Sequence, residues 1–197
     1  MAALGDGLED HAATAGIRYS QAIVNHGLAA GASRRHPHGH LLGIPFVPGE
    51  LLEEIAGFRR FEGGCLLCAT VEAEQDAGYR TLAIDDEVAV IAPWWSGSPF
   101  ELLVVPVQHE GHLHHAAPAS LVAVGTAIRD ALSRLRTLLG DVSYNIVFHT
   151  LPHRGDDPFH WHAHITPRLH SAGGFERGTG VPINIVAPED VAAFLAG

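Results

Sequence analysis

The spacing of hydrophobic and polar positions changes along the chain near residue 63. Before that point the apolar residues are sparse, and the segment at 28–33 (LAAGAS) consists of small residues that let a backbone approach a ligand closely. The elements expected in this first part are a weak helix, a strand, an apolar extended segment limited by prolines, and a short helix, at 5–15, 17–24, 41–47 and 48–58.

Beyond residue 63 the pattern is more regular. The strands expected there lie at 80–84, 88–92, 100–106, 144–149, 161–167 and 182–186. A long amphipathic helix is expected over 117–139 with Gly140 as its stop, and a closing helix over 188–195. The predicted class is α+β, a mostly antiparallel sheet with one long helix packed on it.

Two rows of histidines share the spacing H-x-H-x-H, at 36–40 and 160–164, and 124 positions separate His38 from His162. This interval indicates two copies of one unit. Residues 1–62 are interpreted as the terminal part of a first unit and residues 63–197 as a complete second one. A strand without a sheet is not stable alone. The expectation is therefore that the chain begins late, or that another polypeptide supplies the missing part.

Composition narrows the functional classes. The 197 residues are 47% hydrophobic, the formal net charge is −10, and all twelve basic residues are arginine. An acidic chain without a basic tract argues against non-specific binding of nucleic acid. No segment resembles a signal peptide or a membrane span, so a cytoplasmic protein that does not bind membranes is expected.

The first histidine row is the leading candidate for chemistry. In an extended chain His36, His38 and His40 would share one face, with Pro37 and Gly39 on the other. An imidazole with a pKa near neutrality acts as base, nucleophile or metal ligand. The alternative is a solvated histidine-rich loop.

Cys65-x-x-Cys68 carries the only two cysteines. Two thiolates at this spacing suit a tetrahedral zinc ion, for which His109 and His160 are the candidate remaining ligands. The alternatives are a pair of buried free thiols and a thioredoxin-like redox pair. The redox pair is less favoured because the sequence gives no clear sign of a helix beginning there.

Further histidines are interpreted as solvated loop residues: His112, His114 and His115 in one patch, and His11, His26, His153 and His170 elsewhere. The segment 173–180 (GGFERGTG) is expected to be a flexible loop that could close on a sugar or a phosphate. An ordinary surface loop is the alternative.

Several motifs closely resemble galactose-1-phosphate uridylyltransferases, which are members of the histidine-triad superfamily. In the first part these are Asn25-x-Gly27, the segment 30–33 (AGAS) and the segment 36–39 (HPHG). In the second part they are PFE at 99–101, Pro106-x-x-His109, YN at 144–145, HWH at 160–162, PRL at 167–169, and 173–189. The resemblance covers nearly all of the chain.

The resemblance implies a histidine-triad-like sheet and a double-displacement reaction. His38 would attack the α-phosphorus of a nucleotide sugar and form a nucleotidyl-histidine, which a second sugar phosphate then resolves. Asn25, Gly31 and Ser33 match positions that contact the nucleotide and its phosphates. Phe175 and Glu176 match positions that meet the hexose.

The resemblance also implies metal sites. His36 matches a ligand of a zinc site in the first unit whose other ligands would lie upstream. The second zinc site matches Cys65, Cys68, His109 and His160. Some members hold iron through one glutamate and three histidines instead. The matching residues, which give a rival assignment for the second histidine row, are Glu54, His149, His162 and His164.

His40 stands where the family usually has glutamine. Glutamine donates a hydrogen bond but is no general acid or base, whereas histidine can assist a leaving group. Three functions stay open: a nucleotidyltransferase of the uridylyltransferase type, a histidine-triad nucleotide hydrolase or phosphorylase, and an inactive zinc-binding fragment. The expected partners are a nucleotide sugar and a sugar phosphate, with a homodimer or a separate polypeptide completing the protein.

Overall fold

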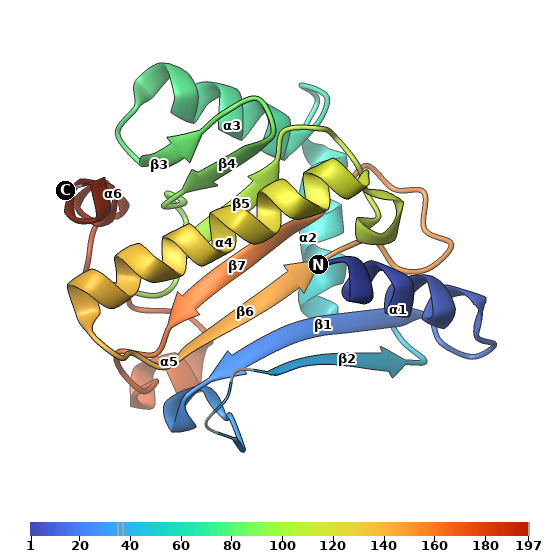
Figure 1. Cartoon of the computed structure of the whole chain (residues 1–197), viewed down its shortest axis with the longest axis horizontal. Helices are drawn as coiled ribbons and strands as arrows, with labels where there is room; N and C mark the ends of the chain where they lie inside the picture. The colour runs from blue at the N-terminus through green and yellow to red at the C-terminus, as the bar shows by residue number, and fades with distance from the viewer. Residues whose placement is uncertain (35, 37, 197) are drawn as a thin grey trace.

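A computed structural model describes residues 1–34, 36 and 38–196 and shows a single sheet with helices on both faces (Figure 1). The elements in chain order are α1 (Ala2–Ala13), β1 (Tyr19–His26), η1 (Leu28–Ala30), β2 (His38–Ile44), α2 (Gly49–Arg60), α3 (Leu66–Ala77), β3 (Thr81–Ile84), β4 (Val88–Ile91), β5 (Leu102–Pro106), η2 (Leu113–His115), α4 (Pro118–Leu139), β6 (Tyr144–His149), β7 (His162–Pro167), α5 (Gly174–Thr179) and α6 (Pro188–Ala196). Among these described residues, no helix is both long and apolar enough to cross a bilayer.

The seven strands follow the order β2-β1-β6-β7-β5-β4-β3, and every neighbouring pair is antiparallel. The longest helix, α4, begins with Pro118 in its first turn and ends at Gly140. These features confirm the predicted α+β class. Strands from both expected units join in one sheet, since β1 pairs with β6. The proposed division between residues 62 and 63 stays a prediction.

The sheet separates two cores. On one face, which we call the helix-covered face, α1, α4 and α6 pack on alternate strand residues such as Ala22, Ile146 and Val104. In Figure 1, α1 and α4 cross in front of the strands and α2 lies behind them. On the rear face, α2 and α3 pack on Leu103 and Val105. That rear face also carries both histidine rows, because directly opposed residues of antiparallel strands point to the same side. We call it the histidine face.

The hairpins β1–β2 and β6–β7 have the same register, as the predicted repeat requires. Asn25 lies opposite His38, and His149 lies opposite His162. In each pair the two residues are thirteen positions apart in the sequence, and each residue of the second pair lies 124 positions after its counterpart in the first. At the seam between the hairpins, Ile23 pairs with its own equivalent, Val147. A pseudo-two-fold axis therefore passes through the sheet beside Ile23, and it places His38 and His162 on one face at opposite ends.

Three sequence expectations about local structure are wrong. A helix, α3, does begin at Leu66, because Leu67, Val71 and Glu74 recur at helical spacing and face the core. The segment 182–186 is not a strand: Ile183 and Ile185 point outward and no neighbouring strand pairs with it. The segment 173–180 contains the short helix α5 instead of a flexible loop.

Two groups of histidines are more ordered than expected. The HLHH segment forms η2 around the fully buried Leu113, and His112 Nε2 donates to the carbonyl of Gly155 over 2.9 Å. His153 is buried, and its Nε2 lies 2.8 Å from Ser20 Oγ. His153 thus joins the 150–157 segment to β1 and His112 joins it to η2, so neither is a solvated loop residue, whereas His115 is exposed as expected.

Candidate active site and metal centres

The first row is anchored at the start of β2. The strand begins at His38, so His38 and His40 share a strand face, while His36 precedes the strand and Pro37 lies outside the described residues. His38 Nδ1 lies 3.1 Å from the backbone oxygen of His36. A carbonyl can only accept, so in the neutral imidazole Nδ1 carries the proton and Nε2 keeps the lone pair. In that tautomer Nε2 is the nitrogen available as a nucleophile.

His40 lies beside this nucleophile. The two imidazole centroids are 4.6 Å apart, with the rings edge to face. His38 is half-buried and His40 is exposed. An exposed imidazole in this position can exchange a proton with a group bound at His38.

A hydrogen-bonded chain fixes the surroundings of His38. Asn145 on β6 donates from Nδ2 to Asn25 Oδ1 over 2.7 Å and to the carbonyl of Ala30 over 2.9 Å. Arg168 Nε donates to Asn145 Oδ1 over 2.6 Å. Asn145 thus ties the residue opposite His38 to η1. The resemblance included Asn145 and Arg168 but assigned them no role, and only the pairing of β1 with β6 places them here.

The candidate nucleotide-binding loop follows η1. Gly31 has φ +78, with nothing within 4 Å of the position of an added Cβ, and Ser33 is exposed. Gly27 has φ +79, and an added Cβ would lie 2.1 Å from Ser143 Oγ. The loop therefore leaves the sheet through a turn that requires glycine at 27. Asn25, Gly31 and Ser33 all belong to the β1–η1–β2 connection that ends at His38.

The two candidate sugar-binding residues lie on α5. Phe175 is exposed, and Glu176 accepts a hydrogen bond from the Gly173 N–H over 3.0 Å. Neither residue forms a hydrogen bond or an ion pair with His38 within the described part of the chain. Glu176 and Arg168 line a shared cavity of about 200 Å³.

The structure brings Cys65, Cys68, His109 and His160 together, as the sequence predicts, with their ligand atoms all within 4.8 Å of one another. His160 Nδ1 lies 3.6 Å from Cys65 Sγ and 3.5 Å from Cys68 Sγ, and His109 Nδ1 lies 3.6 Å from Cys68 Sγ. Tetrahedral zinc with ordinary bond lengths separates its sulfur and nitrogen ligands by about 3.6 Å. The donor set therefore fits a zinc ion.

The protonation of this cluster agrees with metal binding. Burial and the neighbouring Cys65 raise the pKa of Cys68 to about 12, so without a cation the Cys68 thiol keeps its proton. Burial, with the nearby His109 and His162, lowers the pKa of His160 to about 4. Its imidazole is therefore neutral at pH 7, as a metal ligand must be.

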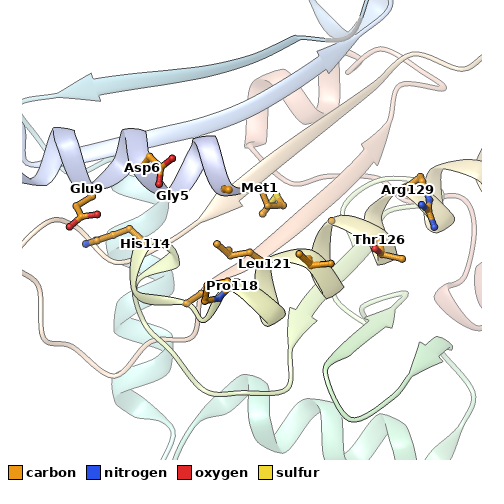
Figure 2. A pocket seen from close by; sticks show the side chains of 13 residues that line it. Met1, Gly5, Asp6, Glu9, His114, Pro118, Leu121, Thr126 and Arg129 are labelled. Carbon is orange, nitrogen blue, oxygen red and sulfur yellow. The ribbon is translucent and has the colours of Figure 1, made fainter.

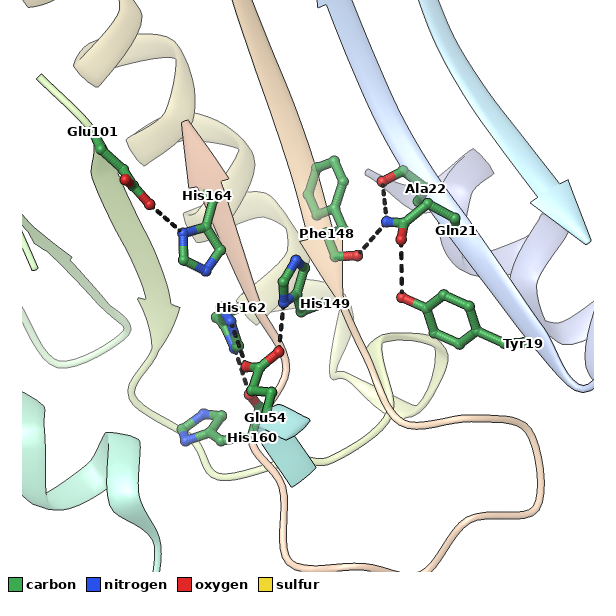
Figure 3. Close-up of polar contacts among 10 residues, drawn as sticks. All are labelled: Tyr19, Gln21, Ala22, Glu54, Glu101, Phe148, His149, His160, His162 and His164. Carbon is green, nitrogen blue, oxygen red and sulfur yellow. Dashed lines mark hydrogen bonds and ion pairs between the residues drawn. The ribbon is translucent and has the colours of Figure 1, made fainter. Parts of the chain in front are cut away.

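A second cluster lies beside the first, on the histidine face (Figure 3). Ligand nitrogens of His149, His162 and His164 lie within 4.8 Å of one another. Glu54 reaches them from α2, with Oε1 3.1 Å from His162 Nε2 and Oε2 2.7 Å from His149 Nδ1. Burial would raise the pKa of Glu54, but these imidazoles outweigh it and hold that pKa well below its usual range. One carboxylate and three imidazoles suit zinc or iron.

Outer contacts orient these imidazoles. His162 Nδ1 donates to the backbone oxygen of His160 over 2.8 Å, which repeats the contact between His38 and His36. Glu101 Oε1 accepts from His164 Nδ1 over 2.9 Å. His160 therefore belongs to the thiol cluster by its side chain and to the second cluster by its carbonyl. No role was predicted for Glu101 from the sequence, although it lies within the PFE motif.

Known proteins share this sequence and fold. The family model described as the HIT domain matches residues 77–171. ADP-glucose phosphorylase of Arabidopsis thaliana is 34% identical over 185 residues, which are 89% of this chain and 51% of that protein. Galactose-1-phosphate uridylyltransferase of Haemophilus influenzae is 28% identical over 162 residues, 78% of this chain and 46% of that protein. By these matches residues 77–171 belong to the HIT domain, and the chain is similar over most of its length to galactose-1-phosphate uridylyltransferases and an ADP-glucose phosphorylase.

A solved structure agrees with this membership. The crystal structure of the Arabidopsis ADP-glucose phosphorylase with bound ADP-glucose superposes with a TM-score of 0.89 and 31% identity, covering 99% of this chain and 64% of that one. This uridylyltransferase-like chain spans about half the length of the curated relatives that it matches.

Proposed function

We propose that this chain carries the nucleotidyl-transfer site of a uridylyltransferase-like enzyme, with His38 as nucleophile. The observation that carries the proposal is the contact between His38 Nδ1 and the His36 oxygen, because in the neutral imidazole it assigns the proton to Nδ1 and the lone pair to Nε2. A neutral imidazole is both a good nucleophile and a good leaving group for phosphorus, so one transfer divides into two easier steps.

In the first step, His38 Nε2 forms a bond to the α-phosphorus of a nucleoside diphosphate sugar. The bond from that phosphorus to the bridging oxygen breaks, and hexose 1-phosphate leaves with the electron pair. In the second step, an oxygen of the acceptor attacks the same phosphorus and His38 regains its lone pair. Asn25, Gly31 and Ser33 are proposed to hold the nucleotide, and Phe175 and Glu176 the hexose.

Phosphorolysis is a second candidate function, with inorganic phosphate as the acceptor in place of a sugar phosphate. His40 favours it, since its exposed imidazole lies 4.6 Å from the His38 ring and can move a proton where glutamine cannot. The 34% identity to an ADP-glucose phosphorylase supports the same assignment. With water as acceptor, the same two steps give hydrolysis.

The thiol cluster is proposed to hold zinc through Cys65, Cys68, His109 and His160. Its role would be structural: it connects the start of α3 to the segments around residues 109 and 160, and His160 in turn orients His162. The second cluster is proposed to hold zinc or iron through Glu54, His149, His162 and His164. Neither metal is proposed to take part in the attack on phosphorus.

An acceptor experiment tests the proposal. The protein is incubated with ADP-glucose or UDP-glucose and, in separate reactions, with galactose 1-phosphate, inorganic phosphate or buffer alone. Transfer to galactose 1-phosphate supports the transferase, formation of the nucleoside diphosphate supports the phosphorylase, and the free monophosphate supports a hydrolase. The His40→Gln variant should shift the products towards the sugar acceptor. If neither nucleotide sugar gives turnover or a nucleotidyl-histidine, the proposal is wrong, and the inactive zinc-binding fragment is the function that agrees with the result.

A further inference from the structure

We infer that the guanidinium of Arg168 binds the phosphate beside the hexose, and so holds the sugar 1-phosphate part of a nucleoside diphosphate sugar. The inference rests on the proposed function, in which His38 attacks the α-phosphorus and a sugar 1-phosphate leaves. The residues proposed above for the nucleotide and the hexose include no cation. Arg168 would supply the positive charge between them.

Two contacts fix Arg168 at the end of β7. Its backbone N–H donates to the carbonyl of Ser143 over 2.7 Å, and its Nε donates to Asn145 Oδ1 over 2.6 Å. Both acceptors are neutral. Within the described part of the chain, Nη1 and Nη2 of Arg168 have no hydrogen-bond partner, and no carboxylate forms an ion pair with this guanidinium. The donors on both terminal nitrogens therefore stay available for an anion.

Asn145 connects Arg168 to the surroundings of the nucleophile. Asn145 Nδ2 donates to Asn25 Oδ1, and Asn25 lies directly opposite His38. Directly opposed residues of antiparallel strands point to one side, so Asn145 and the Arg168 Nε that it binds lie on the histidine face. With neighbouring strands about 4.8 Å apart, β6 lies about 10 Å from β2. A nucleoside diphosphate sugar is long enough to reach from His38 to this guanidinium.

On its other side, Arg168 borders the candidate hexose-binding residues. It lines a cavity of about 200 Å³ with Ser98, His170 and Glu176, among others. The Glu176 carboxylate in that cavity already accepts a hydrogen bond from the Gly173 N–H over 3.0 Å. Figure 1 shows α5 and η1 at the same end of the sheet. Arg168 thus stands between the two groups of candidate residues, where the diphosphate of a nucleotide sugar would lie.

The cavity shown in Figure 2 is not an alternative place for this phosphate. It measures about 460 Å³ and lies between α1 and α4, where Asp6, Glu9, His114 and Arg129 are among its lining residues. Because α1 and α4 pack on the helix-covered face, the sheet separates this cavity from His38. Its two carboxylates would also repel an anion.

The charge balance of the first step favours a cation at Arg168. When His38 Nε2 bonds to the α-phosphorus, the bond to the bridging oxygen breaks and its electron pair stays on that oxygen. The departing phosphate thereby changes from a singly charged diester to a doubly charged monoester. A guanidinium can bind two phosphate oxygens at once, and it stabilises charge that develops during the step. Arg168 is therefore expected to bind the sugar 1-phosphate and to speed its departure.

The test measures binding of glucose 1-phosphate, inorganic phosphate and AMP to the 197-residue protein by titration calorimetry. In Arg168→Met, glucose 1-phosphate and inorganic phosphate should bind about tenfold more weakly or worse, while the affinity for AMP stays within about twofold of the parent protein. Arg168→Gln retains an amide donor for Asn145 without the charge, and it should lose glucose 1-phosphate in the same way.

Arg134→Met is the matched control. Arg134 also donates to one neutral oxygen, the carbonyl of Leu195 over 2.7 Å, but it does so on the helix-covered face. This variant should leave all three affinities unchanged. A weaker affinity for glucose 1-phosphate in Arg134→Met equal to that in Arg168→Met would overturn the inference, because it would then follow from the loss of any arginine.

Three further results would overturn the inference. The first is a parent protein that binds neither glucose 1-phosphate nor inorganic phosphate, and the second is an Arg168→Met protein that binds them as tightly as the parent. The third is an equal loss for AMP, since Arg168 would then act only through Asn145 on the nucleotide site. Binding of glucose 1-phosphate that depends on Arg168, in a protein that forms no nucleotidyl-histidine, would support the inference and contradict the proposed function alone.

Discussion

His162 and His38 hold equivalent places in two hairpins of the same register, but of the two only His162 is bound by a carboxylate. Each donates from Nδ1 to the carbonyl two residues earlier, over 2.8 and 3.1 Å. The Nε2 of His162 then lies 3.1 Å from Glu54, whereas no acidic side chain of the described residues forms an ion pair with His38. The carboxylate therefore suits the site at His162 to a cation, whereas the site at His38 is the one proposed to react with phosphorus.

Removal of one thiol should abolish the first metal site. Cys65→Ala leaves three donors and is expected to lose about one zinc per chain by elemental analysis, with a loss of several kcal/mol in the free energy of unfolding. Glu54→Gln is the matched control, because it changes the second cluster and leaves all four donors of the first intact. Unchanged zinc in Cys65→Ala would exclude this site.

Asn145 should be a positioning residue for His38. The Nδ2 group of Asn145 donates to both Asn25 and the Ala30 carbonyl, and Asn145→Asp replaces this donor by an oxygen that can only accept. Each buried group left unpaired costs about 1–3 kcal/mol. We expect slower nucleotidylation of His38, together with faster amide exchange in η1. Asn184→Asp, which alters a similar amide bonded to Ser96, is the control. Equal effects of the two variants on His38 would contradict a positioning role.

Stability should fall in mildly acidic solution because of the buried His153 and the half-buried His112 and His114 at η2. Burial and adjacent imidazoles lower the pKa of His114 to about 4, and burial lowers those of His112 and His153. The unfolded chain takes up these protons below about pH 6.5, before the folded chain does. Their contribution is therefore complete above that pH and is lost as the pH falls towards 4. Chemical denaturation at several pH values measures it.

His114→Gln tests the assignment of this pH dependence. The variant should flatten the slope of unfolding free energy against pH between about 6.5 and 4. His170→Gln, at an exposed position, should retain the slope of the parent protein. A slope that is the same in all three proteins would show that other groups cause the acid sensitivity.

Gly27→Ala should be more destabilising than Gly16→Ala. Both glycines have positive φ, +79 and +90, so both variants are strained by about 1–3 kcal/mol. Only at Gly27 does the added Cβ also meet another residue, since it would lie 2.8 Å from Ser143 Cβ. Thermal unfolding should show the difference, and adding Ser143→Gly should recover part of it. Equal losses at both positions would argue against the close contact.

The sequence predicted those parts of the fold whose pattern is local. The apolar stripe of α4 and its stop at Gly140 appear where expected, and the spacing of Cys65, Cys68, His109 and His160 predicted a cluster that the structure assembles. The pairing of β1 with β6 could not be read in this way, because the register between strands far apart in the chain has no local signal. Without that pairing, Asn145 had no visible connection to His38.

The errors have physical reasons as well. The glycines of 173–180 suggested a loop, but Glu176 caps the Gly173 N–H and the segment closes into a helical turn. At 182–186 the alternating Ile183 and Ile185 imitate a strand, yet Asn184 bonds to Ser96 and no strand edge is adjacent. Polar contacts between distant segments decided both outcomes.

The most direct test of the account is the position of a covalent nucleotidyl group. The protein is incubated with UDP-glucose and with ADP-glucose without an acceptor, and its mass is measured before and after acid, followed by peptide mapping. We predict one uridylyl or adenylyl group per chain on His38, stable in base and labile in acid, absent in His38→Ala and present in His170→Ala. A folded protein that forms no adduct, or an adduct on His162 or elsewhere, would contradict the assignment of His38 as nucleophile.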